Sequence, residues 1–223
     1  TLTYATGPTQ NNLLVACLML GAGWSAQSGP SGWTLDKEIQ RGTGHYVQIW
    51  SKIAGAGEPT GFTWSWTGSV TCHGVGLEAT GNATTSYIDA SSSTDGGSSN
   101  VTTLTITSPG TLAQAAGLGV AAIGLNGTSG GWLNTWTNSF TEFDNETRLD
   151  VATKITTLTA GTNTTQTWTT ARQAVGAIVH YKASNPDALP TPSTVAATAT
   201  VGVPTVSSAD TTVSPGVVTV SAV

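Results

Sequence analysis

The sequence predicts an all-β fold in which two related halves form an internally duplicated, jelly-roll-like β-sandwich. Apolar and polar residues alternate with a period of two over several short segments, which is typical of strands that bury one face. No stretch of ten or more residues has the apolar spacing of an amphipathic helix. Positions 1–81 recur in the same order at 103–183. An ordered recurrence of this kind indicates a duplication.

The composition indicates a folded protein whose polar surface consists largely of hydroxyl groups. Only 9% of the 223 residues are charged, against about 25% in an average globular domain. The net charge is −5, and the chain has only seven Lys and Arg residues. Because nucleic acids and anionic membrane surfaces attract basic proteins, this balance argues against both as partners. The apolar run 13–20 is too short to insert across a bilayer.

Three segments of the first half have clear strand patterns. The run 13–20 is apolar on both faces and predicts a central strand. Segment 45–53 alternates apolar and polar residues, which predicts a strand with one buried face. In segment 62–67, three aromatic residues alternate with hydroxyl residues. Gly and Pro residues separate these segments and predict turns between them.

The second half repeats these segments at a spacing of about 100 residues. A single match would be chance in a chain so rich in Thr, but an ordered series over eighty residues is not. The matches are Thr1–Tyr4 with Thr103–Ile106, Leu13–Leu20 with Leu118–Leu125, Gly32-Trp33 with Gly131-Trp132, Val47–Ile53 with Leu149–Ile155, Thr63-Trp64 with Thr167-Trp168, and Val75-Gly76 with Val175-Gly176.

The duplication predicts one domain over 1–183, with repeat 1 at 1–81, a linker at 82–102 and repeat 2 at 103–183. The Ser-rich centre of the linker has the composition of a flexible loop. The apolar faces of each repeat are too extensive for about 80 residues to cover alone, which favours one merged sandwich. Two tandem immunoglobulin-like sandwiches are the alternative.

Residues 184–223 form an arm of a different kind. A Pro-marked exit leads into short Val, Thr and Ala runs that have high β propensity but no large side chains for a core. The hypothesis is that this arm pairs with a neighbouring subunit by strand addition; an unattached terminus is the alternative. The candidate assembly residues are Pro190, Val195, Val201, Val206, Val213 and Val220.

The two cysteines, Cys17 and Cys72, lie in apolar runs. Two buried free thiols are one interpretation. A single disulfide between two strands is the other, although the chain lacks the cysteine density of a small secreted scaffold.

A search for catalytic chemistry finds no convincing site, so the sequence predicts a protein without enzymatic activity or cofactor. The three histidines have no metal-ligand spacing, and there is no nucleophile elbow or phosphate loop. One acidic cluster, Glu142, Asp144 and Glu146, is a weak calcium candidate, because calcium takes several carboxylate oxygens. A solvated strand edge is the alternative for this cluster.

The tryptophans divide into two groups. Those that recur in both halves, such as Trp33 and Trp132, are expected in the core. Trp24 and Trp136 lack a Trp partner in the other half and lie among Gly, Ser and Asn residues. An exposed indole can stack on a sugar ring, so these two are candidate glycan-binding residues. Partial burial under a loop is the alternative for both.

Several strings of the first half carry a resemblance to a known group of proteins. They are Gly32-Trp33-Thr34-Leu35, the segment from Tyr46 to Pro59 with Ser-Lys-Ile and Ala-Gly-Ala-Gly-Glu-Pro, Phe62–Trp66, and Ile88-Asp89-Ala90. The chain resembles duplicated β-sandwich structural proteins of tailed bacteriophages and prophages over 1–183, and loosely over the arm. In the second half, Asn163-Thr164 stands where the first has Glu58-Pro59.

The resemblance implies a place on the virion surface, on capsid or tail. The expected partners are other virion proteins, further copies of the chain and a host cell-surface glycan. Two other functions stay open from the sequence. One is a carbohydrate-binding module or lectin of a secreted bacterial protein. The other is a subunit of a surface filament that assembles through the arm.

Overall fold

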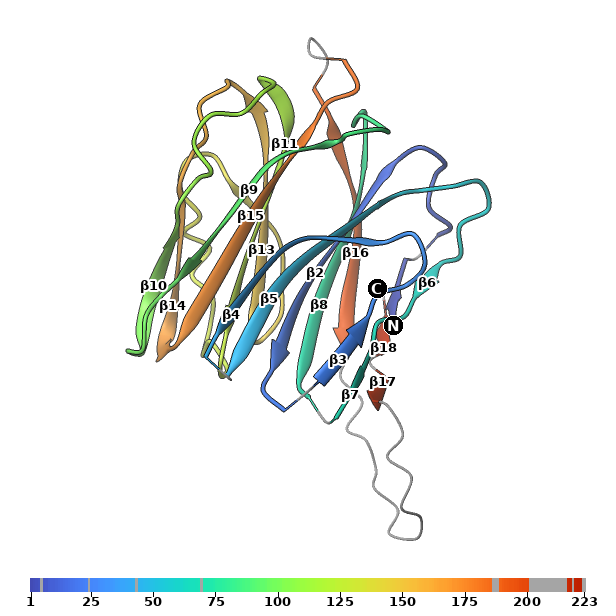
Figure 1. The fold of residues 1–223 in the computed structure, drawn as a ribbon. Helices are drawn as coiled ribbons and strands as arrows, with labels where there is room; N and C mark the ends of the chain where they lie inside the picture. The colour runs from blue at the N-terminus through green and yellow to red at the C-terminus, as the bar shows by residue number, and fades with distance from the viewer. Residues whose placement is uncertain are drawn as a thin grey trace, which may run out of the picture.

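The computed structural model describes residues 1–4, 6–23, 25–42, 44–68, 70–185, 189–200, 216–217 and 219–221. These residues form β-strands and the loops that connect them, without any helix (Figure 1). The predicted all-β class is therefore confirmed. In the part of the chain that is described, no helix is long and apolar enough to cross a membrane.

Two central antiparallel sheets face each other, and each is built mainly from one half of the chain. The first has the order β18 (Thr219–Ser221), β16 (Thr191–Thr200), β8 (Cys72–Thr80), β2 (Leu13–Gly21), β5 (His45–Ile53) and β4 (Thr34–Arg41). The second has the order β12 (Thr141–Asn145), β13 (Leu149–Thr157), β11 (Ala116–Leu125), β15 (Ala174–Lys182) and β9 (Ile88–Asp95).

Smaller sheets cover the outer faces of the two central sheets. On the first half they are β1 (Leu2–Thr3) with β6 (Gly61–Phe62), and β3 (Ser25–Ser28) with β7 (Ser65–Thr67) and β17 (Gly216–Val217). On the second half, β10 (Val101–Ile106) pairs with β14 (Thr164–Arg172). The described strands thus form successive layers rather than one pair of sheets (Figure 1).

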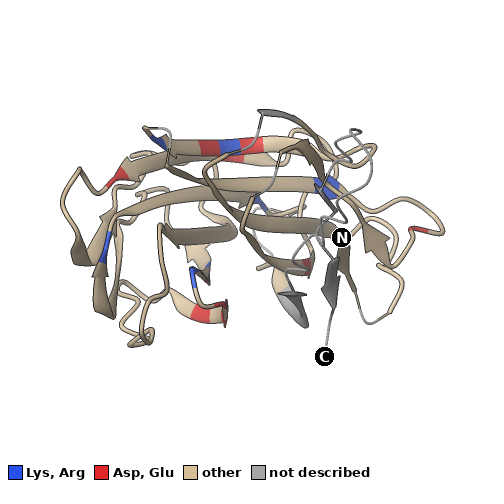
Figure 2. Cartoon of the chain, turned by 90° about the horizontal axis from the view of Figure 1, so that it is seen from below, with Lys and Arg blue, Asp and Glu red and all other residues tan. Residues whose placement is uncertain are grey.

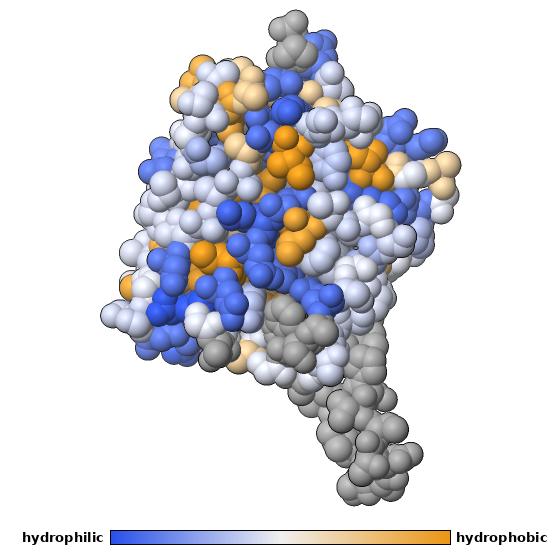
Figure 3. Space-filling view, viewed as in Figure 1, coloured by the Kyte–Doolittle hydropathy of each residue, from blue (hydrophilic) through white to orange (hydrophobic). Residues whose placement is uncertain are grey.

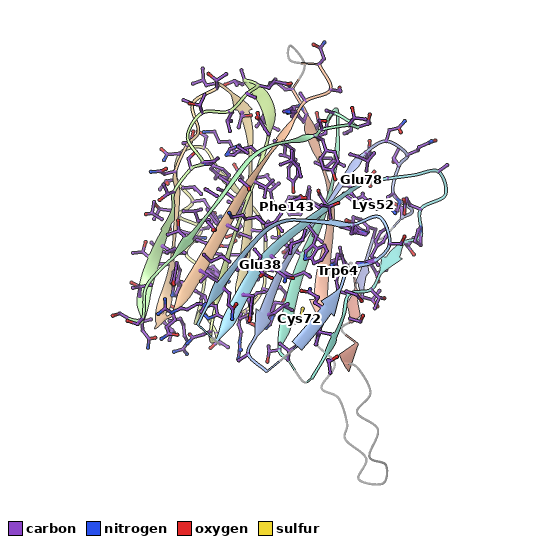
Figure 4. All side chains as sticks on the ribbon, viewed as in Figure 1. Glu38, Lys52, Trp64, Cys72, Glu78 and Phe143 are labelled. Carbon is purple, nitrogen blue, oxygen red and sulfur yellow. The ribbon has the colours of Figure 1, made fainter. Side chains whose placement is uncertain are left out.

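The central strands β2 and β11 show why their sequences are apolar on both faces. Leu13, Val15, Cys17 and Met19 of β2 face a central core that both halves share. The residues between them face an outer core with the aromatic side chains of the first half, including Trp64, labelled in Figure 4. Strand β11 divides its residues in the same way between the central core and the outer core of the second half.

The central core contains residues of both halves, and this packs them as one body. Its buried members from the first half include Val47 and Leu77, and those from the second half include Leu118 and Val179. Tyr181 also crosses the junction, since its hydroxyl donates to Asp36 Oδ2 at 2.6 Å. Each half therefore covers an apolar face of the other.

The two cysteines are free thiols in different cores. Cys17 lies in the central core, and Cys72 (Figure 4) lies in the outer core of the first half. Because the two thiols lie on opposite faces of one sheet, a disulfide between them is excluded. Burial raises the pKa of the Cys72 thiol to about 12.

Residues 88–95 lie inside the predicted linker but form strand β9. The strand pairs antiparallel with β15, with Ile178 opposite Ser92. A Ser-rich segment has no apolar pattern of its own, so its strand conformation comes from the ladder of hydrogen bonds to β15. The expectation of a flexible loop over the Ser-rich centre, residues 91–99, was wrong for 91–95.

Part of the arm lies on the sheet of its own chain. Strand β16 pairs antiparallel with β8 of the same chain, and pairing with a neighbouring subunit stays a prediction. Pro190 is buried just before β16, Val195 lies in β16, and Val220 lies in β18. The other candidate arm residues, Val201, Val206 and Val213, lie outside the described residues.

Figure 2 shows one strand on which acidic and basic residues alternate. Arg41 forms an ion pair with Asp95, and Lys52 forms one with Glu58. The alternating charges Asp36-Lys37-Glu38 lie on edge strand β4, and two acidic residues, Glu142 and Asp144, lie on edge strand β12. Charged edges oppose sheet-to-sheet association. The face seen in Figure 3 is otherwise neutral or polar, with isolated apolar groups.

Candidate functional site

Trp136, one of the two candidate glycan-binding residues, is buried. Its side chain is only 9% exposed and packs in the outer core of the second half. The indole Nε1 donates a hydrogen bond to Asp150 Oδ2 at 3.1 Å. A ring enclosed in this way offers no face to a sugar, so the alternative of burial under a loop is the correct one. Trp24 lies outside the described residues.

The acidic cluster on and beside β12 does not form a metal site. A β-bulge separates Glu142 from Asp144, and Glu142 Oε1 accepts a hydrogen bond from the Asn145 amide at 2.9 Å. Burial, together with the charges of Glu146 and Glu142, raises the pKa of Asp144. Within the described part of the chain, no three His, Cys, Asp or Glu residues are arranged to hold a metal ion. The calcium candidate is therefore not supported by the geometry.

A hollow on the second half is the best candidate for a binding site. It has a volume of about 490 Å³ and is open to solvent. This volume lies within the range of about 300–1,000 Å³ that is usual for small-ligand sites. The hollow is lined by the loop after β11 and by the turn between β12 and β13, that is, by Thr128, Ser129, Gly130, Gly131, Trp132, Asn145, Glu146 and Thr147.

Backbone hydrogen bonds hold the loop after β11 in place. Ser129 N donates to Thr147 O at 2.9 Å, and Thr170 N donates to Ser129 O at 2.8 Å. Gly130 has a φ of 73°, and a Cβ atom at this position would lie 2.0 Å from Thr170 Oγ1. Only glycine fits there without strain. The backbone hydrogen bonds and Gly130 therefore hold the loop against β14 and the β12–β13 turn.

Trp132 supplies the aromatic wall of the hollow. Its ring is only partly buried and packs edge to face on Trp168, with ring centroids 5.7 Å apart. The indole Nε1 donates to Glu146 O at 2.6 Å, which fixes the ring relative to the turn. The hollow therefore has a rigid apolar side.

Polar groups supply the other side of the hollow. Glu146 Oε1 is buried and has no hydrogen-bond partner among the described residues, and Glu146 Oε2 lies 3.8 Å from His73 Nδ1 of the first half. The hydroxyl residues Thr128, Ser129 and Thr147 line the same space. An apolar ring beside hydroxyls and a carboxylate matches a sugar, which has an apolar C–H face and a rim of hydroxyl groups.

Trp132 aligns with Trp33 in the sequence, and this alignment predicts that Trp132 lies in the core. The alignment holds, but the exposure differs: Trp33 is 8% exposed in its core, whereas Trp132 is only partly buried. A usable signal was present in the sequence. Trp132 follows the loop segment Thr128-Ser129-Gly130-Gly131. Trp24 and Trp136 were glycan-binding candidates because they lie among similar residues.

Three acids and imidazoles with strongly shifted pKa values are enclosed in the fold and do not line the hollow. Burial raises the pKa of Asp150 to about 7, although hydrogen bonds from Gln166 and Trp136 oppose the shift. Burial lowers the pKa of His45 and of His180 to about 4 each. All three side chains are at most 2% exposed. Since a catalytic group must reach its substrate, these residues serve the packing of the fold.

Comparison of the chain with protein-family models, with curated proteins and with solved structures gave no match.

Proposed function

We propose that this chain is a non-enzymatic structural protein displayed on the surface of a bacteriophage virion, on capsid or tail. In this proposal the C-terminal arm attaches the protein, and the hollow at Trp132 contacts a host glycan. The virion location is supported by the resemblance of 1–183 to duplicated sandwich proteins of tailed phages. The glycan contact is supported by the geometry of the hollow.

The architecture suits display on a particle. The two halves share a central core, and the strands that follow each half pair with the sheet of the other. A body connected in this way acts as a rigid spacer. Few residues are charged, and charges occupy the edge strands β4 and β12, where they keep neighbouring molecules from pairing edge to edge.

The observation that carries the glycan contact is the partly exposed ring of Trp132 in a hollow that Glu146 and three hydroxyl residues also line. The ring is held by Trp168 and by the hydrogen bond to Glu146 O. A side chain that is already fixed loses little conformational entropy when a ligand binds. Glycans of the host envelope present the apolar faces and hydroxyls that such a site accepts.

Mass spectrometry of purified particles from the source strain tests the location. The expected result is that the chain is present at a constant copy number per particle and remains after a high-salt wash. Absence of the chain from particles, with abundant free chain in the lysate, would remove the virion part of the proposal.

Glycan-array binding tests the hollow. Trp132→Ala should abolish binding, and Glu146→Gln, which keeps the size of the side chain, should weaken it about tenfold, as expected for one charge-assisted hydrogen bond of about 1.4 kcal/mol. Leu158→Ala is the matched control, because Leu158 is 69% exposed and does not line the hollow. Equal binding by all three variants would refute the site.

The same hollow favours a second function, that of a carbohydrate-binding module or lectin of a secreted bacterial protein. The two functions differ in location and share the site. Glycan binding that depends on Trp132, together with absence of the chain from particles, would favour the lectin.

A further inference from the structure

The connections that follow the last sheet strand of each half cross each other. Residues 81–87 lead from β8 to β9, and residues 183–185 follow β15. At the crossing, Ala83 N donates to Lys182 O at 2.9 Å, and Ser184 N donates to Gly81 O at 2.8 Å. Each half therefore gives its next strand to the sheet of the other half.

Strands β9 and β16, which each half gives to the sheet of the other, pair with their receiving strands in the same way. Strand β9 pairs antiparallel with β15, beginning with Ile88 opposite Tyr181. Strand β16 pairs antiparallel with β8, beginning with Thr191 opposite Thr80. In both cases the incoming strand starts beside the end of the receiving strand. The receiving edge thus accepts a strand from a different structural repeat.

Strand β8 needs such a partner. Without β16, one row of its backbone N–H and C=O groups would be unpaired, directly above the buried side chains Val75, Leu77 and Ala79. An unpaired edge over an apolar core promotes association with another chain. The edge strands β4 and β12 carry charges that oppose such association. Among the nine residues of β8, Glu78 is the only Asp, Glu, Lys or Arg.

We infer that β16 is a transferable strand and that its partner in the assembled state is β8 of a second copy of this chain. The inference rests on the arm-mediated attachment of the proposed function and names its acceptor. A copy that donates β16 leaves its own β8 free to receive, so two copies close as a dimer by reciprocal exchange, and more copies form a ring or a filament.

The same backbone contacts form whether β16 comes from its own chain or from another. The balance between pairing within a chain and pairing between chains depends on two concentrations. One is the effective concentration of β16 at β8 of its own chain, which the connection after β15 sets, and the other is the concentration of neighbouring copies. Dilute chains keep β16 on their own sheet, as in the present structure. Chains crowded on a particle exchange it.

Disulfide trapping with the full-length chain tests the exchange. Thr80 and Thr191 are register partners with exposed side chains, and the native cysteines are buried. One chain carries Thr80→Cys and is isotope-labelled; the other carries Thr191→Cys and is unlabelled. After mixing, incubation and mild oxidation, mass spectrometry should detect a mixed disulfide whose yield rises with protein concentration.

Two controls make the result decisive. The double variant T80C/T191C should form its disulfide within one chain at low concentration, which verifies the pairing itself. Thr80→Cys mixed with Ser99→Cys, an exposed position after β9, measures random cross-linking. The inference is overturned if the mixed disulfide never exceeds that control, whether or not the double variant cross-links. In that case, detection of the chain in particles would still support the proposed location.

Discussion

Gln48 and Asp150 occupy equivalent positions on β5 and β13, and both side chains are fully buried. Trp50 Nε1 donates to Gln48 Oε1 at 3.0 Å, and Trp136 Nε1 donates to Asp150 Oδ2 at 3.1 Å. In each half, the polar side chain at this position accepts the hydrogen bond of a buried indole N–H. The second half has exchanged the amide for a carboxylate.

This exchange makes stability depend on pH. Burial raises the pKa of Asp150 from 3.8 to about 7. Since the folded pKa lies above the unfolded value, the stabilisation is complete below pH 3.8 and is lost as pH rises through 7. Asp150→Asn removes this loss, so its free energy of unfolding relative to wild type should rise by about 4 kcal/mol between about pH 4 and pH 8. Urea denaturation measures the difference, and parallel pH profiles would contradict it.

The titration of His45 and His180 changes the free energy of unfolding with pH in the opposite direction, over part of the same pH range. Burial lowers the pKa of each imidazole from 6.5 to about 4. Their stabilisation is therefore present above pH 6.5 and is lost as pH falls through 4. In wild type the gain at Asp150 on acidification offsets part of this loss. The Asp150→Asn variant should accordingly lose stability more steeply than wild type below pH 6.5.

Two glycines at matching positions make room for the first strand of each half. A Cβ atom on Gly76 would lie 2.5 Å from Leu2 Cδ2, and one on Gly176 would lie 2.7 Å from Ile106 Cγ1. Gly76→Ala should lower the free energy of unfolding by about 1–3 kcal/mol, because the core there is already filled. Gly7→Ala, where the nearest atom would be 3.7 Å away, is the control. Equal melting temperatures for the two variants would argue against a tight contact.

At the scale of elements, strand prediction succeeded where a segment carries its own apolar pattern. The runs at 13–20 and 118–125 lie within β2 and β11, and both faces of each strand are buried. Strand β9 was missed because Ser91, Ser92 and Ser93 have no such pattern. Their conformation is set by β15, a partner more than eighty residues away in the sequence.

The pairing of β16 with β8 predicts a local effect of proline. Ala197 lies opposite Gly76 in the register, and proline cannot donate a hydrogen bond to the ladder. Ala197→Pro should speed hydrogen exchange at the β8 amides at least tenfold, whereas Ala197→Ser at the same position should not. Unchanged protection of β8 in the proline variant would show that β16 does not cover this edge.

At the scale of the whole molecule, the shared central core explains why the duplication is retained in one chain. The central sheet of either half, taken alone, would expose an apolar face made of residues such as Val15 or Val120. Burial of apolar surface is the dominant favourable contribution to folding. The two halves therefore depend on each other for stability.

Separate expression of the halves tests this dependence. Residues 103–183 alone should lack a cooperative unfolding transition, and co-expression with 1–102 should recover a soluble complex that co-purifies. Circular dichroism and denaturant titration measure both outcomes. A cooperative transition in the isolated half would mean that its own outer core, between β11 and β14, is sufficient.

The candidate site shows a limit of sequence comparison in a duplicated chain. Trp33 and Trp132 align, but only Trp33 is covered by its neighbours Phe62 and Trp64. Trp132 instead has Trp168 on one side and the loop with Gly130 and Gly131 on the other. Recurrence predicts the position of a residue in the fold, whereas exposure depends on which loops lie above it.

The sequence by itself determined the all-β class, the duplication and the strands with apolar periodicity, because these follow from local patterns that need no partner. The tertiary structure alone decided three other features. These are the pairing of β9 and β16 with the opposite halves, the burial of Trp136 and the exposure of Trp132. The physical reason is that hydrogen-bond ladders and side-chain burial join residues far apart in the chain, and neutral Ser, Thr and Gly segments take the conformation that those contacts impose.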